Sequence, residues 1–310
     1  MKIVSLLPSA TEIVCSLGLD DSLVGITHEC DFPANISDRP AVTASRISHE
    51  TMSSLEIDHA VRSQLDGHGS IYDLDNDLLH RLQPDLILTQ ELCDVCAVSY
   101  KTVLKAAKIY VADAQVVSLE PNTLGDIFDN IITVGELTGT TEKAEHTVAA
   151  FQKRIDDVRS KTSSLKDRPS VFMLEWLEPP FAPGHWVPEQ VEAAGGICLL
   201  GEAGLPSVTT TFDAICDAQP DIIVMIPCGY YIHDTLRQLD QTQFPSKWRG
   251  IPAIRNGNVW ATDATSYFSR PGPRVVEGVE ILAKIFHPDI FGEPAEHEAV
   301  RVPIDLLRFS

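Results

Sequence analysis

A short segment occurs twice in this chain, and the two copies lie on either side of a long helical stretch. The copies are Leu82-Gln83-Pro84-Asp85-Leu86-Ile87 and Ala218-Gln219-Pro220-Asp221-Ile222-Ile223, which match almost residue for residue. In each copy a Pro-Asp pair leads into an apolar run that is typical of a buried parallel strand. This internal repeat predicts two lobes of similar architecture.

The helical stretch between the copies runs from about residue 122 to residue 161. A first helix covers 122–139, the pattern restarts at Thr140, and apolar residues then recur at alternating spacings of four and three, which places them on one stripe of a helix. The stripe consists of Ala144, Val148, Phe151, Ile155 and Val158. At about 1.5 Å per residue, a helix over 141–161 is roughly 30 Å long. That length suits either a strut between two lobes or a surface helix of one large domain.

The chain has 310 residues and 44% hydrophobic content, enough to bury a full core in two domains. We predict an α/β fold with two Rossmann-like lobes, each with a central sheet, joined by one long rigid helix. The N-terminal lobe is expected over 1–121, the connecting helices over 122–165, and the C-terminal lobe with its tail over 166–310. A first strand over 2–7 leads into a helix, where Ser9 and Glu12 have the spacing of a capping box. The tail itself, 288–310, receives no predicted role.

Charge and cysteine content limit the partners and the compartment. With 44 acidic and 24 basic residues the net charge is −20, which argues against nucleic acid or an anionic membrane as the main partner. No apolar run is long enough for membrane insertion, and the start of the chain has no signal-peptide pattern. A cytoplasmic location is therefore expected, or a periplasmic one if the N-terminus is incomplete. Seven cysteines, an odd number, favour a reducing compartment.

Polar and thiol side chains follow three predicted strands, at the strand ends where open α/β sheets bind ligands. The residues concerned are His28, Glu29 and Cys30 after the strand over 23–27, Cys93 and Cys96 after the strand over 84–89, and Cys228 and Tyr230 after the strand over 220–225. Thiolate and imidazole are ligands of soft metals, so His28, Cys30, Cys93, Cys96 and Cys228 form a predicted metal group for an ion such as zinc. Acidic neighbours favour a metal, which supplies positive charge, over unassisted redox chemistry.

Two tryptophans mark a loop region of the second predicted lobe. Trp176 follows a strand end, and Trp186 lies in Pro183-Gly184-His185-Trp186; either ring has a flat face that suits a macrocycle. For Trp186 the alternative is a buried plug beneath its own loop. No Ser-His-Asp order, nucleotide loop or carboxylate pair stands out, so nothing in the sequence requires catalysis and binding is favoured over an enzyme.

Several motifs together resemble a known family. They are Leu7-Pro8-Ser9-Ala10-Thr11-Glu12, Gln83-Pro84-Asp85-Leu86-Ile87, Glu178-Pro179-Pro180-Phe181 with Gly195-Gly196, and Tyr267-Phe268-Ser269-Arg270-Pro271-Gly272-Pro273-Arg274. Over residues 2–287 the chain resembles the substrate-binding proteins of cobalamin and iron-siderophore ABC transporters, and among them is most similar to the vitamin B12-binding member. This resemblance implies two α/β lobes joined by one long helix, with the ligand in the cleft between them.

The resemblance also implies site residues. Tyr267 and Phe268 match positions where the family meets its ligand, and a family aromatic of the first lobe falls on Ile71 or Tyr72, whereas its second-lobe counterpart falls near Ser207, where no aromatic stands. Two acidic positions that engage the transporter permease fall on Asp77 and Asp213.

Three functions compete after these steps. The first is binding of a corrinoid, cobalamin-like or cobinamide-like, or of a related metal chelate, for delivery to a permease or a corrinoid-handling enzyme. The second is a cytoplasmic thiol-based metal-binding or redox protein. The third is a zinc- or haem-binding protein on the same scaffold. Fold motifs favour the first, and the cysteines favour the other two.

Overall fold

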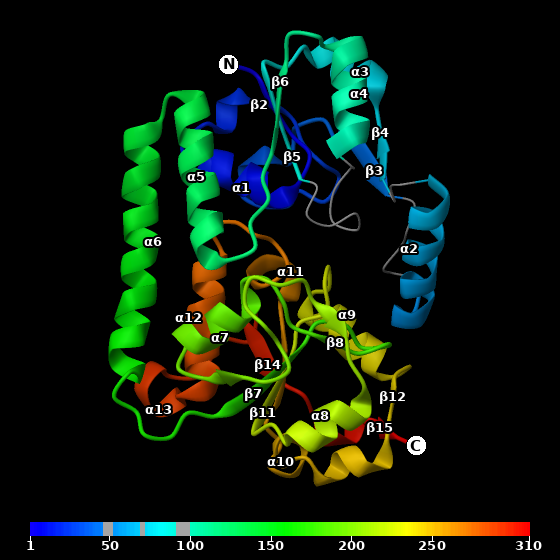
Figure 1. Ribbon diagram of the computed structural model, residues 1–310, viewed down its shortest axis with the longest axis vertical. Helices are drawn as coiled ribbons and strands as arrows, with labels where there is room; N and C mark the ends of the chain where they lie inside the picture. Colours follow the sequence, from blue (N-terminus) through cyan, green and yellow to red (C-terminus); the bar gives the residue numbers. More distant parts are fainter. Residues whose placement is uncertain (46–51, 69–71, 91–99) are drawn as a thin grey trace. The chain divides into compact units, whose positions relative to one another are not determined.

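The structure is a computed structural model that describes residues 1–45, 52–68, 72–90 and 100–310 (Figure 1). The chain divides into two compact units: unit 1 takes 1–48, 59–121 and 125–149, and unit 2 takes 49–58, 122–124 and 150–310. Each unit has its own mostly or wholly parallel sheet with helices around it, which confirms the predicted α/β class. None of the helices in the described residues is both long and apolar enough to cross a membrane.

The sheet of unit 1 has four strands, all parallel, in the order β2-β1-β5-β6. Its strands are β1 (Ile3–Ser5), β2 (Leu23–Gly25), β5 (Leu86–Thr89) and β6 (Gln115–Ser118). Ile87 and Leu88 are both fully buried although they point to opposite faces, because helices cover a parallel sheet on both sides. The predicted Pro-Asp strand of the first copy is therefore a central strand of this sheet.

The other elements of unit 1 surround that sheet. They are α1 (Pro8–Ser16), η1 (Asp20–Ser22), η2 (Ala34–Ile36), the antiparallel pair β3 (Thr43–Ser45) and β4 (Tyr72–Leu74), α3 (Asn76–Leu82) and α4 (Tyr100–Tyr110). The predicted capping box at the start of α1 is wrong. Helix α1 begins at Pro8, directly after Leu7, without a side-chain cap, because proline at the first helical position has no N–H to satisfy. Ser9 and Glu12 are instead buried.

The long helical stretch consists of α5 (Leu124–Thr138) and α6 (Thr141–Thr162), separated by Gly139 in a left-handed conformation with φ of 72°. The predicted restart at Thr140 and the stripe on α6 are confirmed, since four of its five residues, Ala144, Val148, Ile155 and Val158, are buried and Phe151 is partly buried. The N-terminal part of α6, up to Ala149, belongs to unit 1, and the rest belongs to unit 2.

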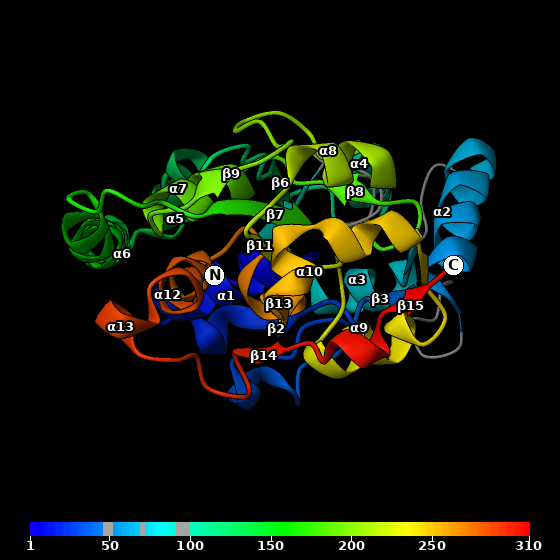
Figure 2. The ribbon, with the colours of Figure 1, turned by 90° about the horizontal axis from the view of Figure 1, so that it is seen from below.

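The sheet of unit 2 has five strands in the order β14-β13-β11-β7-β9, and all except β14 are parallel (Figure 2). Its strands are β7 (Ser170–Leu174), β9 (Ile197–Cys198), β11 (Ile222–Met225), β13 (Val259–Thr262) and β14 (Ala299–Arg301). The main core of this unit packs Phe172, Met225 and Ala261 with Phe244 and Trp248, all of them fully buried.

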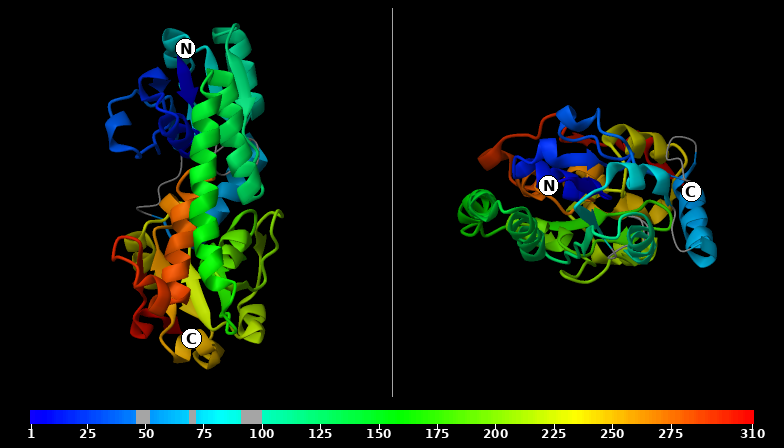
Figure 3. Two further views of the ribbon diagram at one scale, coloured as in Figure 1. Left: turned by 90° about the vertical axis from the view of Figure 1, so that its left-hand side faces the viewer. Right: turned by 90° about the horizontal axis from the view of Figure 1, so that it is seen from above.

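The remaining elements of unit 2 are helices and two small strand pairs. They are α7 (Val187–Ala193), α8 (Phe212–Ala218), α9 (Ile232–Leu239), η3 (Ser246–Gly250), α10 (Pro252–Arg255), α11 (Ala264–Tyr267), α12 (Val275–Phe286), α13 (Pro288–Phe291), η4 (Ile304–Leu306), the antiparallel pair β8 (Phe181–Ala182) and β10 (Val208–Thr209), and the parallel pair β12 (Gln243–Phe244) and β15 (Arg308–Phe309). Helix α12 runs beside the second half of α6 (Figure 3, left), where Arg154 donates hydrogen bonds to both oxygens of Glu280 and to Glu277.

The two copies of the repeated segment adopt the same local structure. Gln83 ends α3 and Gln219 ends α8, each in a left-handed conformation with φ of 48°. The side-chain Nε2 of each glutamine donates a hydrogen bond of 2.6 Å to a backbone carbonyl of its own helix. The Pro-Asp pair that follows each glutamine leads into a central strand. The sequence repeat is thus a structural repeat of helix, turn and strand.

The C-terminal tail, for which the sequence predicted no role, completes unit 2. Strand β14 joins the edge of the sheet antiparallel to β13, and β15 pairs with β12. The carboxylate of Glu298 accepts two hydrogen bonds from Lys284 Nζ, at 2.8 and 2.7 Å, which fixes the tail to α12. Val302 and Leu307 are buried in the main core of unit 2.

Candidate functional site

In unit 1, polar side chains gather just beyond the end of β2. The phenol of Tyr72 donates a hydrogen bond to Glu29 Oε1 at 3.2 Å, and His28 Nε2 lies 3.8 Å from the same oxygen. The rings of His28 and Tyr72 lie 5.5 Å apart between centroids, tilted by 52°. The structure therefore brings together three predicted ligand residues from two chain segments, which we call the Glu29 cluster: His28, Glu29 and Tyr72.

Thr43 on β3 orients the imidazole of this cluster. Its Oγ1 accepts the backbone N–H of His28 at 3.3 Å and lies 2.8 Å from Nδ1 of the same residue. These two contacts fix the orientation of the imidazole ring and leave Nε2 as the ring nitrogen that faces Glu29. About a quarter of the His28 side chain and a third of the Glu29 side chain are exposed, so both remain accessible.

Cys30 faces different partners from its neighbour His28. Its Sγ lies 3.1 Å from Thr11 Oγ1 and 3.4 Å from Thr27 Oγ1. Both contacts hold the thiol against α1 and the end of β2, in an environment of hydroxyl groups.

The predicted metal group is only partly covered by the structure. Cys93 and Cys96 lie outside the described residues, as does Ile71. Cys228 is an exposed free thiol after β11, in unit 2. Within the described ranges no three His, Cys, Asp or Glu side chains are grouped so as to hold a metal ion. The donors in these ranges do not make a zinc site by themselves.

In unit 2, Trp176 and Tyr230 form an edge-to-face pair with ring centroids 5.2 Å apart. The indole Nε1 of Trp176 donates to the backbone carbonyl of Ser54 at 3.2 Å. Tyr230 is fully buried, and its hydroxyl lies 3.5 Å from Ser54 Oγ. Burial raises the pKa of Tyr230, so its phenol stays protonated. Trp176 and Tyr230, both predicted to bind ligand, are therefore in contact with each other and with Ser54.

Three other predicted aromatic residues lie elsewhere in unit 2. Trp186 is 6% exposed, and its Nε1 donates to the backbone carbonyl of Phe268 at 2.9 Å. Phe268 is 2% exposed, close to Gly278 of α12. Both rings are interior in this structure and would reach a ligand only after rearrangement. Tyr267 is half-buried, and burial is the main cause that raises its pKa.

The two predicted docking residues occupy equivalent places. Asp77 and Asp213 are each the second residue of their helix, α3 and α8, directly before the two copies of the repeat. Both are exposed, and Asp213 forms an ion pair with Lys247. A carboxylate at this position is favoured by the helix dipole as well as by any partner.

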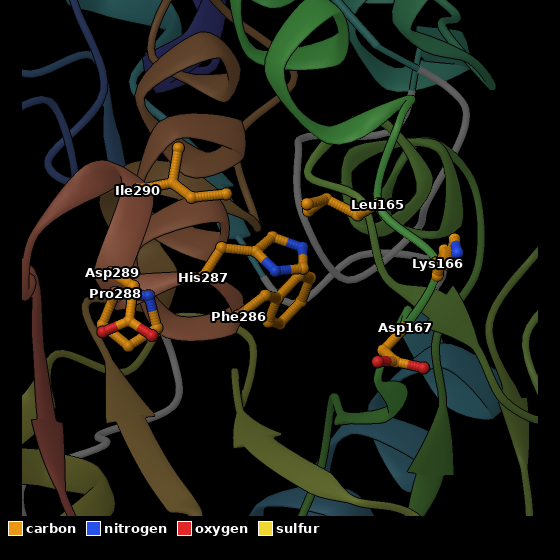
Figure 4. A pocket seen from close by; sticks show the side chains of 8 residues that line it. All are labelled: Leu165, Lys166, Asp167, Phe286, His287, Pro288, Asp289 and Ile290. Atoms are coloured by element: carbon orange, nitrogen blue, oxygen red, sulfur yellow. The ribbon is translucent and has the colours of Figure 1, made fainter.

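A small pocket of about 270 Å³ lies away from all of these residues (Figure 4). It is lined by Leu165, Lys166, Asp167, Phe286, His287, Pro288, Asp289 and Ile290. The rings of Phe286 and His287 stand nearly perpendicular, with centroids 6.3 Å apart. Burial lowers the pKa of His287, the backbone of Gly195 opposes that shift, and Arg168 adds to it. None of the residues predicted to bind ligand lines this pocket.

Three residues that matter to these sites escaped sequence reasoning: Thr43, Ser54 and Gln238. Gln238 is 2% exposed, donates from Nε2 to the carbonyl of Met52 at 3.0 Å, and accepts the N–H of Ser54 at 3.3 Å. A single Thr, Ser or Gln carries no pattern, so nothing in the sequence alone could have singled these residues out.

Comparison with known proteins gives a consistent result. Residues 3–265 match the model of the periplasmic binding protein family. The vitamin B12-binding protein of Vibrio cholerae is 23% identical over 90% of this chain and 86% of its own length. The ABC transporter substrate-binding lipoprotein YvrC of Bacillus subtilis, an uncharacterized protein, is 26% identical over 94% of this chain and 82% of its own.

The fold is also that of a solved structure, a periplasmic heme-binding protein from Pseudomonas aeruginosa. It superposes with a TM-score of 0.68 at 19% identity, over 93% of this chain and 92% of that one. None of these matches supports the alternative of a thiol-based redox protein. With a family model that spans most of its length and the two-unit α/β architecture described above, the chain belongs to the periplasmic binding protein family.

Proposed function

We propose that this chain binds a corrinoid, or a closely related metal chelate, and hands it to a permease. The vitamin B12-binding protein of Vibrio cholerae supports the ligand class, and the Bacillus subtilis lipoprotein supports the ABC transporter context. The observation that carries the proposal is the Glu29 cluster, in which a carboxylate is positioned by a phenol and faces an imidazole.

The charge of this cluster separates two ligand classes. The edge of a corrinoid carries neutral amides, whose N–H groups are donors for a carboxylate, whereas haem carries two carboxylates of its own. A carboxylate facing another carboxylate is repelled, and the chain already has a net charge of −20. Glu29 therefore favours an amide-bearing chelate over a dicarboxylate. The rings of His28 and Tyr72 add flat area beside it.

The test is a titration with dicyanocobinamide, cyanocobalamin and haemin, followed by absorbance and calorimetry. We expect a corrinoid to bind more tightly than haemin. Glu29→Gln keeps the shape but removes the charge, and should weaken corrinoid binding about tenfold, the size of one charge-assisted hydrogen bond. Asp113→Asn, an exposed change in the same unit, is the matched control. Haemin binding that exceeds both corrinoids would reject the corrinoid assignment in favour of haem.

We further propose that Asp77 and Asp213 dock a basic partner surface, because the two units present them at equivalent helix positions. Asp77→Lys and Asp213→Lys should each weaken binding to membranes that contain the cognate permease, while ligand affinity in solution stays the same. Salt should weaken the wild-type interaction as well, since exposed charges are screened. Unchanged membrane binding of the double variant would reject this role.

A further inference from the structure

Residues 52–58 are held by unit 2, although the chain before and after them belongs to unit 1. This segment contains the first turn of α2 (Ser54–His68). We call it the clasp. Ser54 and Ile57 are buried, whereas Leu55 and Glu56 are exposed. One side of the clasp therefore rests on unit 2, and the other side faces solvent.

Hydrogen bonds hold the clasp, in addition to the buried side chain of Ile57. Gln238 binds it twice, through the carbonyl of Met52 and the N–H of Ser54. Trp176 Nε1 binds the carbonyl of Ser54, and Tyr230 lies beneath the hydroxyl of the same residue. The side chains of Gln238, Trp176 and Tyr230 therefore each lie against a backbone or hydroxyl group of the clasp.

The clasp is also well formed in itself. Ser53 and Glu56 make a reciprocal capping box: the N–H of Ser53 donates to Glu56 Oε2 at 2.8 Å, and the N–H of Glu56 donates to Ser53 Oγ at 3.3 Å. Hydrogen bonds from the Ser53 backbone and side chain lower the pKa of Glu56. A capped first turn keeps its shape when its outer contacts break, so the clasp can move as one piece.

We propose that the clasp is a releasable cover over Trp176 and Tyr230, and that the bound chelate displaces it. This inference rests on the proposed function. The groups that the clasp offers are amide carbonyls and amide N–H donors, and the side-chain amides at the edge of a corrinoid are the same groups. Exchange of one set for the other leaves no buried donor of Trp176 or Gln238 unsatisfied, so release costs little hydrogen bonding.

A cover of this kind lowers the apparent affinity, because only the fraction of molecules with an open clasp can bind. A substitution that weakens the clasp without touching the rings beneath it should therefore tighten ligand binding. A substitution in an ordinary binding residue does the opposite. The direction of the change separates a cover from a binding surface.

Ser54→Pro is the substitution that isolates the clasp. Proline has no N–H, so the hydrogen bond to Gln238 Oε1 is lost, and the hydroxyl near Tyr230 is removed as well. Ser54 is the first residue of α2, where proline is well accommodated and the helix itself should persist. Ser54→Ala is the matched control, since it removes the hydroxyl but keeps the N–H.

Two measurements follow on wild type, Ser54→Pro and Ser54→Ala: hydrogen exchange of the amides at 55–58 with and without dicyanocobinamide, and the dissociation constant for that compound. In wild type, ligand should speed exchange in the clasp. Ser54→Pro should show fast exchange without ligand and bind five- to tenfold more tightly, while Ser54→Ala should change the constant less than threefold. Gln238→Ala, with exposed Gln241→Ala as its control, should also speed exchange in the free protein.

The outcomes distinguish the two proposals. Corrinoid binding with unchanged exchange at 55–58, or Ser54→Pro binding no more tightly than wild type, overturns the clasp and leaves the proposed function standing. Absence of corrinoid binding in every variant rejects the proposed function, and the clasp as a ligand-released cover is rejected with it. If Ser54→Pro fails to fold, slow exchange in Gln238→Ala overturns the clasp.

Discussion

The carboxylate of Asp85 accepts a hydrogen bond of 2.7 Å from the backbone N–H of Lys2, which connects the start of β5 to the start of β1. In unit 2, Asp221 accepts the N–H of Ser170 at 2.9 Å in the same way, at the start of β11 and β7. In both units the backbone N–H of the aspartate also donates a hydrogen bond of 2.9 Å to the backbone carbonyl of the same partner, Lys2 or Ser170. The Pro-Asp pair of the sequence repeat is therefore a clamp between two neighbouring strands of each sheet.

Removal of one clamp should destabilise only its own unit. All four tryptophans, Trp176, Trp186, Trp248 and Trp260, belong to unit 2, so their fluorescence follows the unfolding of that unit. We expect Asp221→Ala to lower the free energy of unfolding by about 1–2 kcal/mol in fluorescence-detected denaturation, because its carboxylate accepts exposed hydrogen bonds from both the N–H and the hydroxyl of Ser170. Asp85→Ala should instead shift the circular dichroism transition and leave the fluorescence midpoint in place. Equal shifts of the fluorescence midpoint by both variants would contradict this separation.

The ion cluster between α6 and α12 should depend on the shape of arginine. Arg154 donates hydrogen bonds to both carboxylate oxygens of Glu280, from Nε and a terminal nitrogen, and a further one to Glu277. The hydrogen bond to Glu280 is the main cause that raises the pKa of Arg154. Lysine carries the same charge but cannot form the fork. We expect Arg154→Lys to cost about 0.5–1 kcal/mol, discounted because a third of each side chain is exposed.

Fluorescence-detected denaturation of Arg154→Met should show a somewhat larger loss than Arg154→Lys. The control is Arg159→Met, which breaks only an exposed i,i+3 pair with Asp156. If Arg159→Met destabilises unit 2 as much as Arg154→Met, the cluster has no special role.

Stability of unit 2 should fall as the pH drops below about 6.5. His185 and His287 both have a lowered pKa in the folded protein, chiefly because burial disfavours the charged imidazole. The unfolded chain then binds more protons than the folded one below the ordinary histidine pKa, so this stability is complete above pH 6.5 and is lost as the pH falls towards the folded pKa.

The histidine contribution is measurable as the difference in unfolding free energy between pH 7.5 and pH 5.5, followed by tryptophan fluorescence. We expect His287→Leu to reduce this difference, because the titrating group is gone. Ile290→Ala, which alters the same pocket without removing an ionisable group, serves as the control and should leave the difference unchanged. An unaltered pH dependence in His287→Leu would show that the pocket histidine does not contribute.

The close approach of α5 and α6 should tolerate no added methyl group at Gly135. A Cβ at this position would lie 2.5 Å from Ala144 Cβ, so Gly135→Ala forces the helices apart and should cost about 1–3 kcal/mol in unit 1. The double variant Gly135→Ala/Ala144→Gly moves the methyl group to the other helix and should recover much of the loss. Gly250→Ala, with nothing within 4 Å, is the neutral control. A double variant no more stable than Gly135→Ala would contradict this packing.

Local pattern in the sequence was sufficient to predict much of the fold. The stripe on α6, the restart at Thr140 and the two Pro-Asp strands all depend on residues within a few positions of one another, and helix and strand periodicity report such neighbours directly. The family motifs predicted the α/β class for the same reason. The Glu29 cluster was partly visible, because residues that follow a strand meet at the edge of a sheet.

Only the tertiary structure decided the rest. Ser54 and Gln238 are 184 positions apart, and no periodicity connects them, so the clasp could not be foreseen. The tail looked featureless because its strands are only three and two residues long, and they form by pairing with β13 and β12. Short strands and isolated polar side chains gain their stability from distant partners. Sequence therefore determined the long helices and the central strands of this protein, and packing determined the short strands and which polar groups meet.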